Sequence, residues 1–331
     1  MGIRTKKGVR WVDNFDSIDQ IIAVARMYYE GKLTQSEISR RVNLSCPTIS
    51  RMLKKAKEKG FVQTVVIDPF ESSNNLQAQL KKVFNLRDVR VVNAYSGNPR
   101  TTKTIVCEAA AEYIAELVKP GDILGMASST TTLEIAKAMH PMEVEKVSVV
   151  SISGCTYEHI IDEDVFNSIR LMGKKLGAEI RFLYTPVIVS STRVKNVYLS
   201  DSNTRLAMQM IEDCNIAVNS VGYFGRHSQL YRYGYLDEEA MSLLEKKKTV
   251  GNIASHYYDL SGTLTNRDVA NRTIGITLDQ LKTKEYSICV ACGQEKVMAL
   301  LGALRGGYVN VLIIDDATAK SILIENSVLR E

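Results

Sequence analysis

Residues 33–62 read LTQSEISRRVNLSCPTISRMLKKAKEKGFV, the pattern of two short helices joined by a tight turn. Thr34, followed three residues later by Glu37, forms a capping box that predicts the start of the first helix. The segment 43–45 breaks that helix. Pro47 is tolerated in the first turn of the next helix, because its missing N–H would be unpaired there anyway. Such a unit is a helix-turn-helix, and its second helix is the one that enters the major groove in DNA-binding proteins.

The second helix of this unit has an apolar face and a cationic face. Ile49, Leu53 and Ala56 recur at helical spacing and predict its inner side. Short polar and arginine side chains near the start of such a helix reach base edges, while lysines further along contact phosphates. The residues expected to contact DNA are Thr34, Gln35, Ser45, Pro47, Thr48, Ser50, Arg51, Lys54 and Lys55. A basic amphipathic helix alone can be plain solvated surface, but the two-helix context favours DNA.

The positive charge of the chain is concentrated at its N-terminal end. Residues 1–66 contain 13 Lys and Arg against 6 Asp and Glu, whereas the rest of the chain contains 29 against 31. This distribution attracts a polyanion to one part of the molecule and makes the affinity fall with salt. A helix predicted over 18–30 and a strand predicted over 61–67 flank the two-helix unit, so we expect a winged helix-turn-helix domain over 1–67.

The pattern changes after a polar, turn-forming stretch at 68–75, which we interpret as a linker. Short branched-aliphatic runs then alternate with amphipathic stretches over 76–331, which predicts a doubly wound, Rossmann-like α/β domain that binds an effector and oligomerises. The predicted strands cover 89–93, 123–126, 147–152, 180–182, 216–220, 286–291 and 309–314. The predicted helices cover 76–84, 103–118, 130–139, 164–176, 201–213, 237–246, 278–282 and 294–305. Small molecules bind such sheets beyond the carboxyl ends of the strands.

The clearest strand-to-helix junction is 125–132, which places four hydroxyls at a helix N-terminus. These are Ser128, Ser129, Thr130 and Thr131. Amide N–H groups at a helix N-terminus carry partial positive charge, and hydroxyls add donors, so the junction suits a phosphate. A simple N-cap with spare hydroxyls is an equally good interpretation.

Two further junctions carry weaker signals. The segment 151–155 follows a predicted strand and contains Gly154, which lets backbone approach a ligand. The segment 292–296 places a glycine after a strand and Lys296 at the start of a helix, where an ammonium can close on an anion. A lysine in such a place is more often solvated than bound.

The cysteines and the hydropathy pattern exclude several classes of protein. Six cysteines are scattered at 46, 107, 155, 214, 289 and 292, as expected of reduced thiols and not of a disulfide framework. Cys289 and Cys292 form a C-x-x-C inside an apolar run typical of a buried strand, with no second pair or nearby histidine, so we expect no metal and no cofactor. No stretch approaches the eighteen or so apolar residues that cross a bilayer, and a cytoplasmic location is expected.

Taken together, these segments resemble the SorC family of sugar-binding bacterial transcriptional regulators, most of all its deoxyribonucleoside-operon branch. The resemblance covers nearly the whole chain. It is carried by the helix-turn-helix segment, GDILG, RYGYLDEEAMSLLEKKKTVGNIASHYYD, NRTIGITLDQLK and ALRGGYVNVLIIDDATAKSIL. It implies a winged helix-turn-helix joined to an effector domain with the fold of sugar-phosphate isomerases and deaminases. Members are usually tetramers whose binding to operator DNA changes when a phosphorylated sugar binds.

The resemblance also implies which residues bind the effector. Thr130 and Thr131 match a hydroxyl pair that holds phosphate, and Lys296 matches a lysine that reaches the ligand anion. Asp259 matches an acidic residue that binds sugar hydroxyls, and Gly154 matches the first glycine of a Gly-Gly turn. The full set expected at the effector site is Ser128, Ser129, Thr130, Thr131, Ser153, Gly154, Cys155, Arg226, Asp259, Gly293 and Lys296. Arg226 is included for its place in the glycine-flanked loop 222–227, where an arginine turns either to a ligand or to solvent.

The chain departs from the family pattern at several of these positions. Ala127-Ser128-Ser129 stands where the family usually has Ser-Trp-Gly, and Cys155 replaces the second glycine of the Gly-Gly turn. Cys292-Gly293 stands where a later Gly-Gly is usual. Some deoxyribose-phosphate responders carry an imine-forming lysine where this chain has Ser153. A hydroxyl has no amine to condense with an aldehyde, so Ser153 cannot form that imine.

The sequence therefore predicts a DNA-binding transcriptional regulator, a repressor of a carbohydrate catabolic operon that is switched by a phosphorylated sugar and acts as a dimer or tetramer. Two alternatives stay open. One is a DNA-binding oligomer whose effector domain has lost its ligand, and the other is a sugar-phosphate isomerase-like enzyme. Isomerisation needs a base with a tuned pKa facing a second acid group, and none of the four histidines lies at a junction with paired carboxylates.

Overall fold

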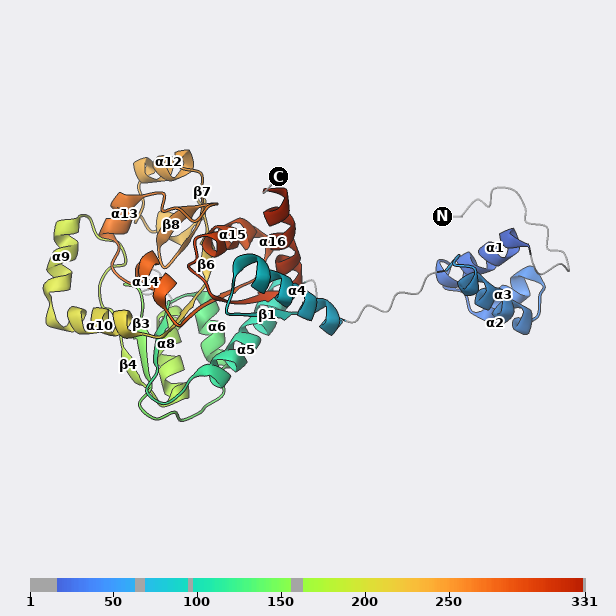
Figure 1. Cartoon of the computed structure of the whole chain (residues 1–331), viewed down its shortest axis with the longest axis horizontal. Helices are drawn as coiled ribbons and strands as arrows, with labels where there is room; N and C mark the ends of the chain where they lie inside the picture. The colour runs from blue at the N-terminus through green and yellow to red at the C-terminus, as the bar shows by residue number, and fades with distance from the viewer. Residues whose placement is uncertain (1–16, 63–68, 95–97, 156–162, 330–331) are drawn as a thin grey trace. The chain divides into compact units, whose positions relative to one another are not determined.

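The computed structural model describes residues 17–62, 69–94, 98–155 and 163–329 of the 331-residue chain (Figure 1). Contacts within the chain divide it into two compact units, Met1–Asp68 and Pro69–Glu331. Each unit has a hydrophobic core of its own. Among the described residues, no helix is both long enough and apolar enough to span a bilayer.

The described part of the first unit consists of α1 (Ile18–Tyr29), α2 (Gln35–Val42) and α3 (Cys46–Glu58). The predicted capping box is present, since Thr34 accepts a hydrogen bond from the N–H of Glu37 and the Glu37 carboxylate accepts one from the N–H of Thr34 at 2.8 Å. Asn43 ends α2 in the left-handed conformation, with φ of 55°. Ser45 then caps α3 by accepting from the N–H of Thr48. These local signals fix the turn of a helix-turn-helix.

The three helices share one small core. Ile49, Leu53 and Ala56 of α3 are buried, as their spacing predicts, and they pack with Ile21 of α1 and Ile38 of α2. This packing leaves the opposite side of α3 at the surface. The strand predicted over 61–67 lies mostly outside the described residues.

The start of the second unit differs from the prediction of a linker over 68–75. Helix α4 (Pro69–Phe84) begins at Pro69 and so occupies most of that stretch. Proline is favourable in the first turn of a helix. The polar composition that suggests a linker belongs to the exposed side of α4, where Asn74 and Asn75 lie, while Leu76 and Leu80 are buried.

A seven-stranded parallel sheet forms the centre of the second unit, with strand order β1-β10-β9-β5-β2-β3-β4. The strands are β1 (Asp88–Val92), β2 (Ile123–Met126), β3 (Ser148–Ser151), β4 (Glu179–Arg181), β5 (Ile216–Asn219), β9 (Tyr286–Ala291) and β10 (Val311–Asp315). The seven strands predicted from the sequence are confirmed, with small shifts at their ends. From β2 the chain adds β3 and β4 on one side and then returns to place β5 on the other, so the strand order reverses between β2 and β5.

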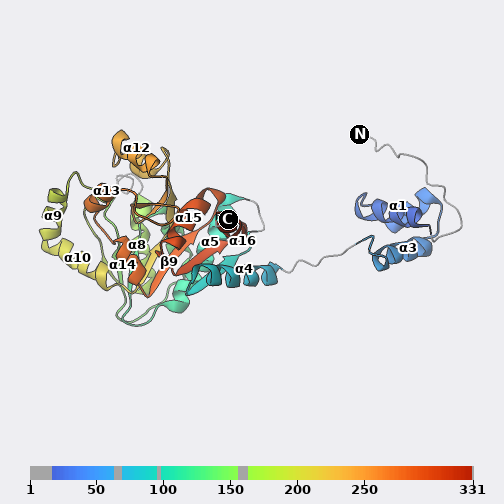
Figure 2. The ribbon, with the colours of Figure 1, turned by 45° about the horizontal axis from the view of Figure 1, so that its top comes forward.

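Helices cover both faces of this sheet, which confirms the doubly wound architecture (Figures 1 and 2). One face packs against α5 (Pro99–Leu117), α6 (Thr130–Ala138) and α8 (Glu163–Leu176). The other packs against α4, α10 (Ser202–Asp213), α14 (Leu278–Thr283), α15 (Val297–Arg305) and α16 (Asp316–Val328). In β9, Ile288 and Val290 face the first group while Cys289 and Ala291 face the second. Burial on both faces explains the continuous apolar runs of the sequence.

A second, antiparallel sheet of three strands was not predicted. It consists of β6 (Val221–Tyr223), β7 (Thr249–Ile253) and β8 (His256–Asp259), and β6 follows β5 after the single residue Ser220. Neighbouring tyrosines of β8 face opposite ways. Tyr258 packs into the main core, and its hydroxyl donates to the carbonyl of Ala299 in α15, whereas Tyr257 packs in a separate cluster with Val187 and Leu230. The helices α9 (Thr192–Ser200), α11 (Gln229–Arg232), α13 (Arg267–Arg272) and α16 were also not predicted.

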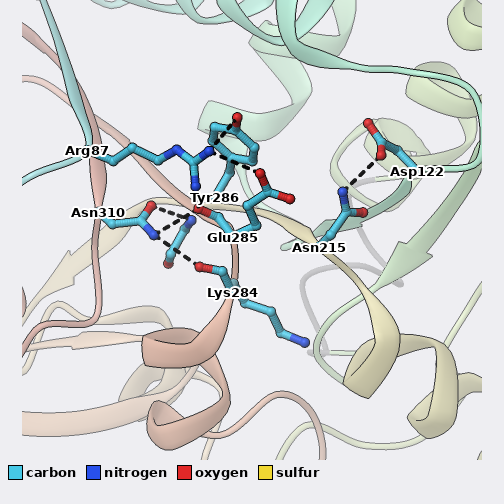
Figure 3. Close-up of polar contacts among 8 residues, drawn as sticks. Arg87, Asp122, Asn215, Lys284, Glu285, Tyr286 and Asn310 are labelled. Carbon is cyan, nitrogen blue, oxygen red and sulfur yellow. Dashed lines mark hydrogen bonds and ion pairs between the residues drawn. The ribbon is translucent and has the colours of Figure 1, made fainter.

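Polar side chains join the amino ends of five neighbouring strands (Figure 3). Arg87, just before β1, donates to the carboxylate of Glu285 at 3.0 Å and to the hydroxyl of Tyr286 at 2.9 Å, at the start of β9. Asn310, just before β10, accepts from the N–H of Ser287 at 2.7 Å. In the same way, Asn215 before β5 donates to Asp122 before β2 at 2.9 Å. We call these seven labelled residues and Ser287 the amino-end network, namely Arg87, Asp122, Asn215, Lys284, Glu285, Tyr286, Ser287 and Asn310.

Candidate functional site

A cavity of about 410 Å³ opens at the carboxyl end of the main sheet, where the strand order reverses between β2 and β5. Segments that follow β2, β3 and β5 contribute Ser128, Ser153 and Ser220 to its wall. The small antiparallel sheet and the segment leading into α11 close it from the other side. This is the place where open α/β sheets bind small molecules, because loops on either side of the reversal diverge and leave a crevice.

The start of α6 forms one wall of the cavity and uses its hydroxyls in two ways. Ser129 is the N-cap, because its Oγ accepts from the N–H of Thr132 at 3.1 Å. Ser128, Thr130 and Thr131 line the cavity without capping the helix. The first backbone N–H groups of an α-helix have no partner within the helix, so those of Thr130 and Thr131 are available to a ligand. The N-cap interpretation of this junction is therefore confirmed for Ser129, and the hydroxyls of Ser128, Thr130 and Thr131 do not cap the helix.

Cationic side chains surround this helix start. The ammonium of Lys296, at the end of η1 (Gln294–Lys296), donates to Ser220 Oγ at 3.1 Å, and that of Lys103 donates to Thr130 Oγ1 at 3.0 Å. Arg232 and His227 also line the cavity. Among the described residues of the cavity wall there is no Asp or Glu. Together with the positive end of α6, this wall favours an anion.

Of the residues that the sequence assigns to the effector site, six line this single cavity. They are Ser128, Ser129, Thr130, Thr131, Ser153 and Lys296. These residues come from three segments that are far apart in the sequence, and the parallel sheet brings them together because it aligns the carboxyl ends of its strands.

Gly154, Cys155 and Gly293 do not line the cavity, and each supports the fold beside it. A Cβ on Gly154 would lie 2.6 Å from the carbonyl oxygen of Thr185, so this close approach requires glycine. The N–H of Cys155 donates to the same carbonyl at 2.7 Å, and burial raises the pKa of the Cys155 thiol, which keeps it protonated. Gly293 has φ of 103° and its N–H donates to Thr318 Oγ1 at 2.9 Å, which sets the turn that leads to Lys296.

Arg226 and Asp259 also lie outside the cavity wall and are engaged elsewhere. The guanidinium of Arg226 pairs with Glu238 of α12 (Glu238–Lys246) at 2.9 Å and lies over the ring of Tyr231. The next residue, His227, lines the cavity instead. The Asp259 carboxylate accepts from the N–H groups of Ser261 and Thr263, each at 2.9 Å, and so organises the turn after β8.

The cavity residues of the small sheet and of the segment before α11 are not among the residues predicted from the sequence. Two of them, Tyr257 and Ser228, are buried with 1% and 9% of their surface exposed. Neither the Tyr257 hydroxyl nor Ser228 Oγ has a hydrogen-bond partner among the described residues. Burying a hydroxyl without a partner costs about 1–3 kcal/mol. Such groups are common where a ligand completes the bonding.

The turn between β7 and β8 also borders the cavity. It consists of Ala254 and Ser255, with φ of 47° and 64°, both in the left-handed region that favours glycine. His256, which follows, is buried, and its Nδ1 lies 2.8 Å from the carbonyl of Ala254. Burial lowers the pKa of His256, so the ring is neutral and its Nδ1–H donates to this carbonyl.

The residues predicted to contact DNA gather at the start of α2 and along α3. Ser50, Arg51 and Lys54 are exposed on α3. Pro47 is exposed at its first turn, whereas Gln35, Thr48 and Lys55 are partly buried. Thr34 and Ser45 are exposed too, but their hydroxyls serve the caps of α2 and α3. Because caps occupy these two hydroxyls, Ser50 and Arg51 are the side chains of the first turns of α3 best placed to meet bases.

The cavity wall combines hydroxyl, amide and basic side chains with apolar ones such as Val187 and Leu230, and His227 is its single histidine among the described residues. Among the described residues, no group of three or more His, Cys, Asp or Glu side chains could hold a metal ion. Cys289 is completely buried within β9 and packs in the core on one face of the sheet, whereas Cys292, which follows β9, packs against the core on the other face.

Family models match both units of the chain. The model for the sugar-binding domain covers residues 68–324, and the model for the MarR family covers residues 17–64. The sugar-binding model alone spans more than half of the chain. It includes every residue of the cavity, and the MarR model includes α1, α2 and α3.

Characterised relatives share this two-part organisation along nearly their whole length. The deoxyribonucleoside regulator of Bacillus subtilis is 37% identical over 302 residues, which cover 91% of this chain and 96% of that protein. The sorbitol operon regulator of Klebsiella pneumoniae is 24% identical over 314 residues, covering 94% of this chain and all of that one. The crystal structure of that full-length regulator, SorC, superimposes with a TM-score of 0.71 and 25% identity over 93% of this chain and 99% of its own. The chain therefore belongs to the SorC family of sugar-binding bacterial transcriptional regulators, and it is a DNA-binding regulator that responds to a ligand.

Proposed function

We propose that this regulator represses a carbohydrate catabolic operon and is switched by a phosphorylated sugar. The observation that carries the proposal is the composition of the cavity at the start of α6. Free helical N–H groups, Thr131 and the Lys296 ammonium converge there, with no carboxylate among the described lining residues. A phosphate ester matches this set better than a neutral sugar does, because it supplies the negative charge that the cations and the helix N-terminus favour.

The relatives support the carbohydrate part of the proposal through the operons they are named for. These names refer to deoxyribonucleosides, which contain a deoxyribose sugar, and to sorbitol, which is a sugar alcohol. An enzyme with an isomerase-like fold would need a base facing a second acid group. The described cavity wall offers no carboxylate for that role, which supports a binding site without turnover.

The proposed partner at the other unit is operator DNA, in the cytoplasm. The net positive charge of residues 1–66 and the exposed Arg51 and Lys54 on α3 support it. We further propose a dimer or tetramer, in which paired recognition helices read half-sites about one helical turn apart. The effector then acts by binding one arrangement of the oligomer more tightly than the other, and its effect on operator affinity is limited to that difference.

A thermal-shift screen of the full-length protein tests the effector class. Matched pairs of phosphorylated and unphosphorylated sugars and polyols are added, since a ligand at a hundred times its dissociation constant stabilises the protein by about 2.7 kcal/mol. We expect stabilisation by phosphorylated members only. The same compounds should then lower operator affinity in a gel shift, as expected of an effector that releases a repressor. Equal stabilisation by the unphosphorylated partners would contradict the phosphate proposal.

The substitution Thr131→Val tests whether the phosphate binds at the start of α6. It removes one hydroxyl donor and keeps the shape of the side chain, so the dissociation constant of a phosphorylated hit should rise about tenfold. Thr192→Val, at the exposed first position of α9, makes the same chemical change at a residue that does not line the cavity and should leave binding unchanged. An unaltered dose–response curve for Thr131→Val would mean that the phosphate lies elsewhere.

A further inference from the structure

We propose that Tyr257 and Ser228 form a second recognition pole of the cavity, which hydrogen-bonds the hydroxyl groups on the carbon chain of the effector. This proposal rests on the proposed function, because it assigns one end of the same ligand. It names the two side chains that distinguish a polyhydroxylated ester from a deoxygenated one.

Two buried hydroxyls of the cavity wall lack hydrogen-bond partners in the described part of the chain. Tyr257 and Ser228 both line the cavity and are at least nine-tenths buried, yet Tyr257 OH and Ser228 Oγ have no partner among the described residues. Buried polar groups in native proteins are almost always hydrogen-bonded. Two exceptions in one cavity wall indicate that a bound molecule supplies the missing partners.

Tyr258, the next residue on the same strand, provides a direct comparison for the hydroxyl of Tyr257. Tyr258 is also fully buried on the same strand, but its hydroxyl donates to the carbonyl of Ala299 at 3.0 Å. It therefore needs no ligand. The fold therefore gives a partner to the hydroxyl of the tyrosine that packs in the main core and leaves the hydroxyl of the cavity-lining tyrosine without one among the described residues.

The side chains that pack beside Tyr257 in the cavity wall are apolar. Val187 and Leu230 line the cavity and pack in the same cluster as Tyr257, and their side chains offer it no hydrogen bond. Burial raises the pKa of Tyr257, which keeps its hydroxyl protonated and neutral. Two neutral hydroxyls in an apolar pocket match the donor and acceptor hydroxyls of a sugar, whereas the helix start and Lys296 provide the charged groups for its phosphate.

This division of labour predicts how the effector is selected. A site built to hydrogen-bond a ligand hydroxyl rejects an analogue that lacks it, because the buried protein group is then left without a partner. An ester without hydroxyls should bind through its phosphate alone. The second recognition pole would therefore decide which sugar phosphate switches the regulator.

The test uses Tyr257→Phe and Ser228→Ala in the full-length protein, with Tyr258→Phe as the matched control. Melting temperature is measured without ligand, and affinity is measured by calorimetry for a panel of pentose and hexose phosphates and for inorganic phosphate. Each cavity variant should raise the dissociation constant of the bound sugar phosphate about tenfold or more, while leaving that of inorganic phosphate within twofold. Without ligand, both should melt at or above the temperature of the unaltered protein, because each loses a buried group that had no partner.

The control separates a binding role from a structural one. Tyr258→Phe removes a hydroxyl that is hydrogen-bonded inside the core, so it should lower the melting temperature and leave sugar-phosphate affinity unchanged. If Tyr257→Phe instead lowers the melting temperature as the control does, or binds the sugar phosphate as tightly as the unaltered protein, the second pole does not exist. Failure of the unaltered protein to bind any phosphate ester would instead refute the proposed function, which distinguishes the two failures.

Discussion

At the scale of single residues, serine and threonine at helix starts have two separate roles in this protein. Ser45 and Ser129 accept hydrogen bonds from backbone N–H groups and so cap the starts of α3 and α6. Ser50 and Thr131, a few residues on, are left to meet a partner outside the helix. An N-cap hydroxyl contributes about 1 kcal/mol to stability, so its removal should be read in folding and not in binding.

Arg51 should determine which DNA sequence is preferred. It is exposed on the second turn of α3, where an arginine can contact a guanine edge with two hydrogen bonds. Arg51→Ala should lower the preference for the operator over unrelated DNA by about 1–3 kcal/mol and leave effector binding intact. A gel-shift competition measures this. Arg26→Ala on α1 is the matched control, and equal specificity in both variants would take Arg51 out of the reading surface.

His256 should make the stability of the effector unit depend on pH. Burial lowers its pKa below 6.5, so the unfolded chain binds the proton more readily than the folded one. The free energy of unfolding should therefore be constant above pH 6.5 in respect of this group, and should fall as the pH drops from 6.5 to the lowered pKa. Urea unfolding of the unaltered protein and of His256→Asn checks this. Parallel pH dependences in the two proteins would rule His256 out.

At the scale of elements, the turn between β7 and β8 shows how a local conflict is tolerated at a ligand site. A two-residue hairpin turn favours Asn-Gly, because both positions have positive φ. This chain places Ala254 and Ser255 there, with φ of 47° and 64°. The surrounding sheet holds them in that conformation, at a cost that the rest of the unit offsets.

Ser255→Gly should relieve part of this conflict. Glycine adopts positive φ without a steric penalty, so the free energy of unfolding of the ligand-free protein should rise by about 1 kcal/mol. Ser242→Gly, on an exposed position inside α12, is the opposite control and should lower it by about 0.5–1 kcal/mol. Chemical unfolding measures both. A loss of stability in Ser255→Gly would mean that the serine side chain supports the turn.

The same turn explains which elements could be predicted from sequence. Strands with both faces buried, such as 123–126 and 286–291, appear as apolar runs and were found with their ends correct. The strands β6, β7 and β8 are short, and Ala254-Ser255 is not the Asn-Gly or Asp-Gly pair that marks a two-residue hairpin, so the small sheet left no clear local signal. Helix α16 was missed because apolar residues such as Ile322, which is buried, and Ile324, which is exposed, form no single stripe.

The cavity could be predicted only in part for a related reason. Thr130, Thr131 and Lys296 lie at strand-to-helix junctions, which sequence patterns reveal. Tyr257 and Ser228 reach the cavity through the tertiary placement of the small sheet, which no local pattern records. Arg226 and Asp259 have side chains suited to a sugar, but partners close to them in the sequence engage both.

At the scale of the whole molecule, charge separates the two tasks. Residues 1–66 hold 13 of the 42 Lys and Arg but only 6 of the 37 Asp and Glu, and the rest of the chain is close to neutral. The phosphorylated effector that we propose would therefore find positive charge locally, at the start of α6 and at Lys296, and not in the overall charge of its unit. In this proposal, DNA and the effector bind to different charged groups.

The salt dependence of operator binding should report on the basic unit alone. Affinity should fall steeply between 50 and 200 mM salt, by about a thousandfold or more if six or more phosphates are contacted. Lys54→Ala should weaken binding to all DNA sequences alike and reduce the logarithmic salt slope by about 1. Titrations at several salt concentrations check this, with the effector affinity as the internal control. A change of sequence preference would instead place Lys54 at a base.

The amino-end network has a consequence for how such a regulator diversifies. Arg87, Asn215 and Asn310 hold the strands together at one rim of the sheet, while the strand ends that contribute to the proposed effector cavity lie at the other rim. A substitution that changes which sugar is accepted therefore breaks none of these bonds. The residues that hold the sheet together and the residues proposed to select the ligand lie at opposite ends of the same strands. Descendants of one ancestor can therefore acquire new effectors while they keep the same scaffold.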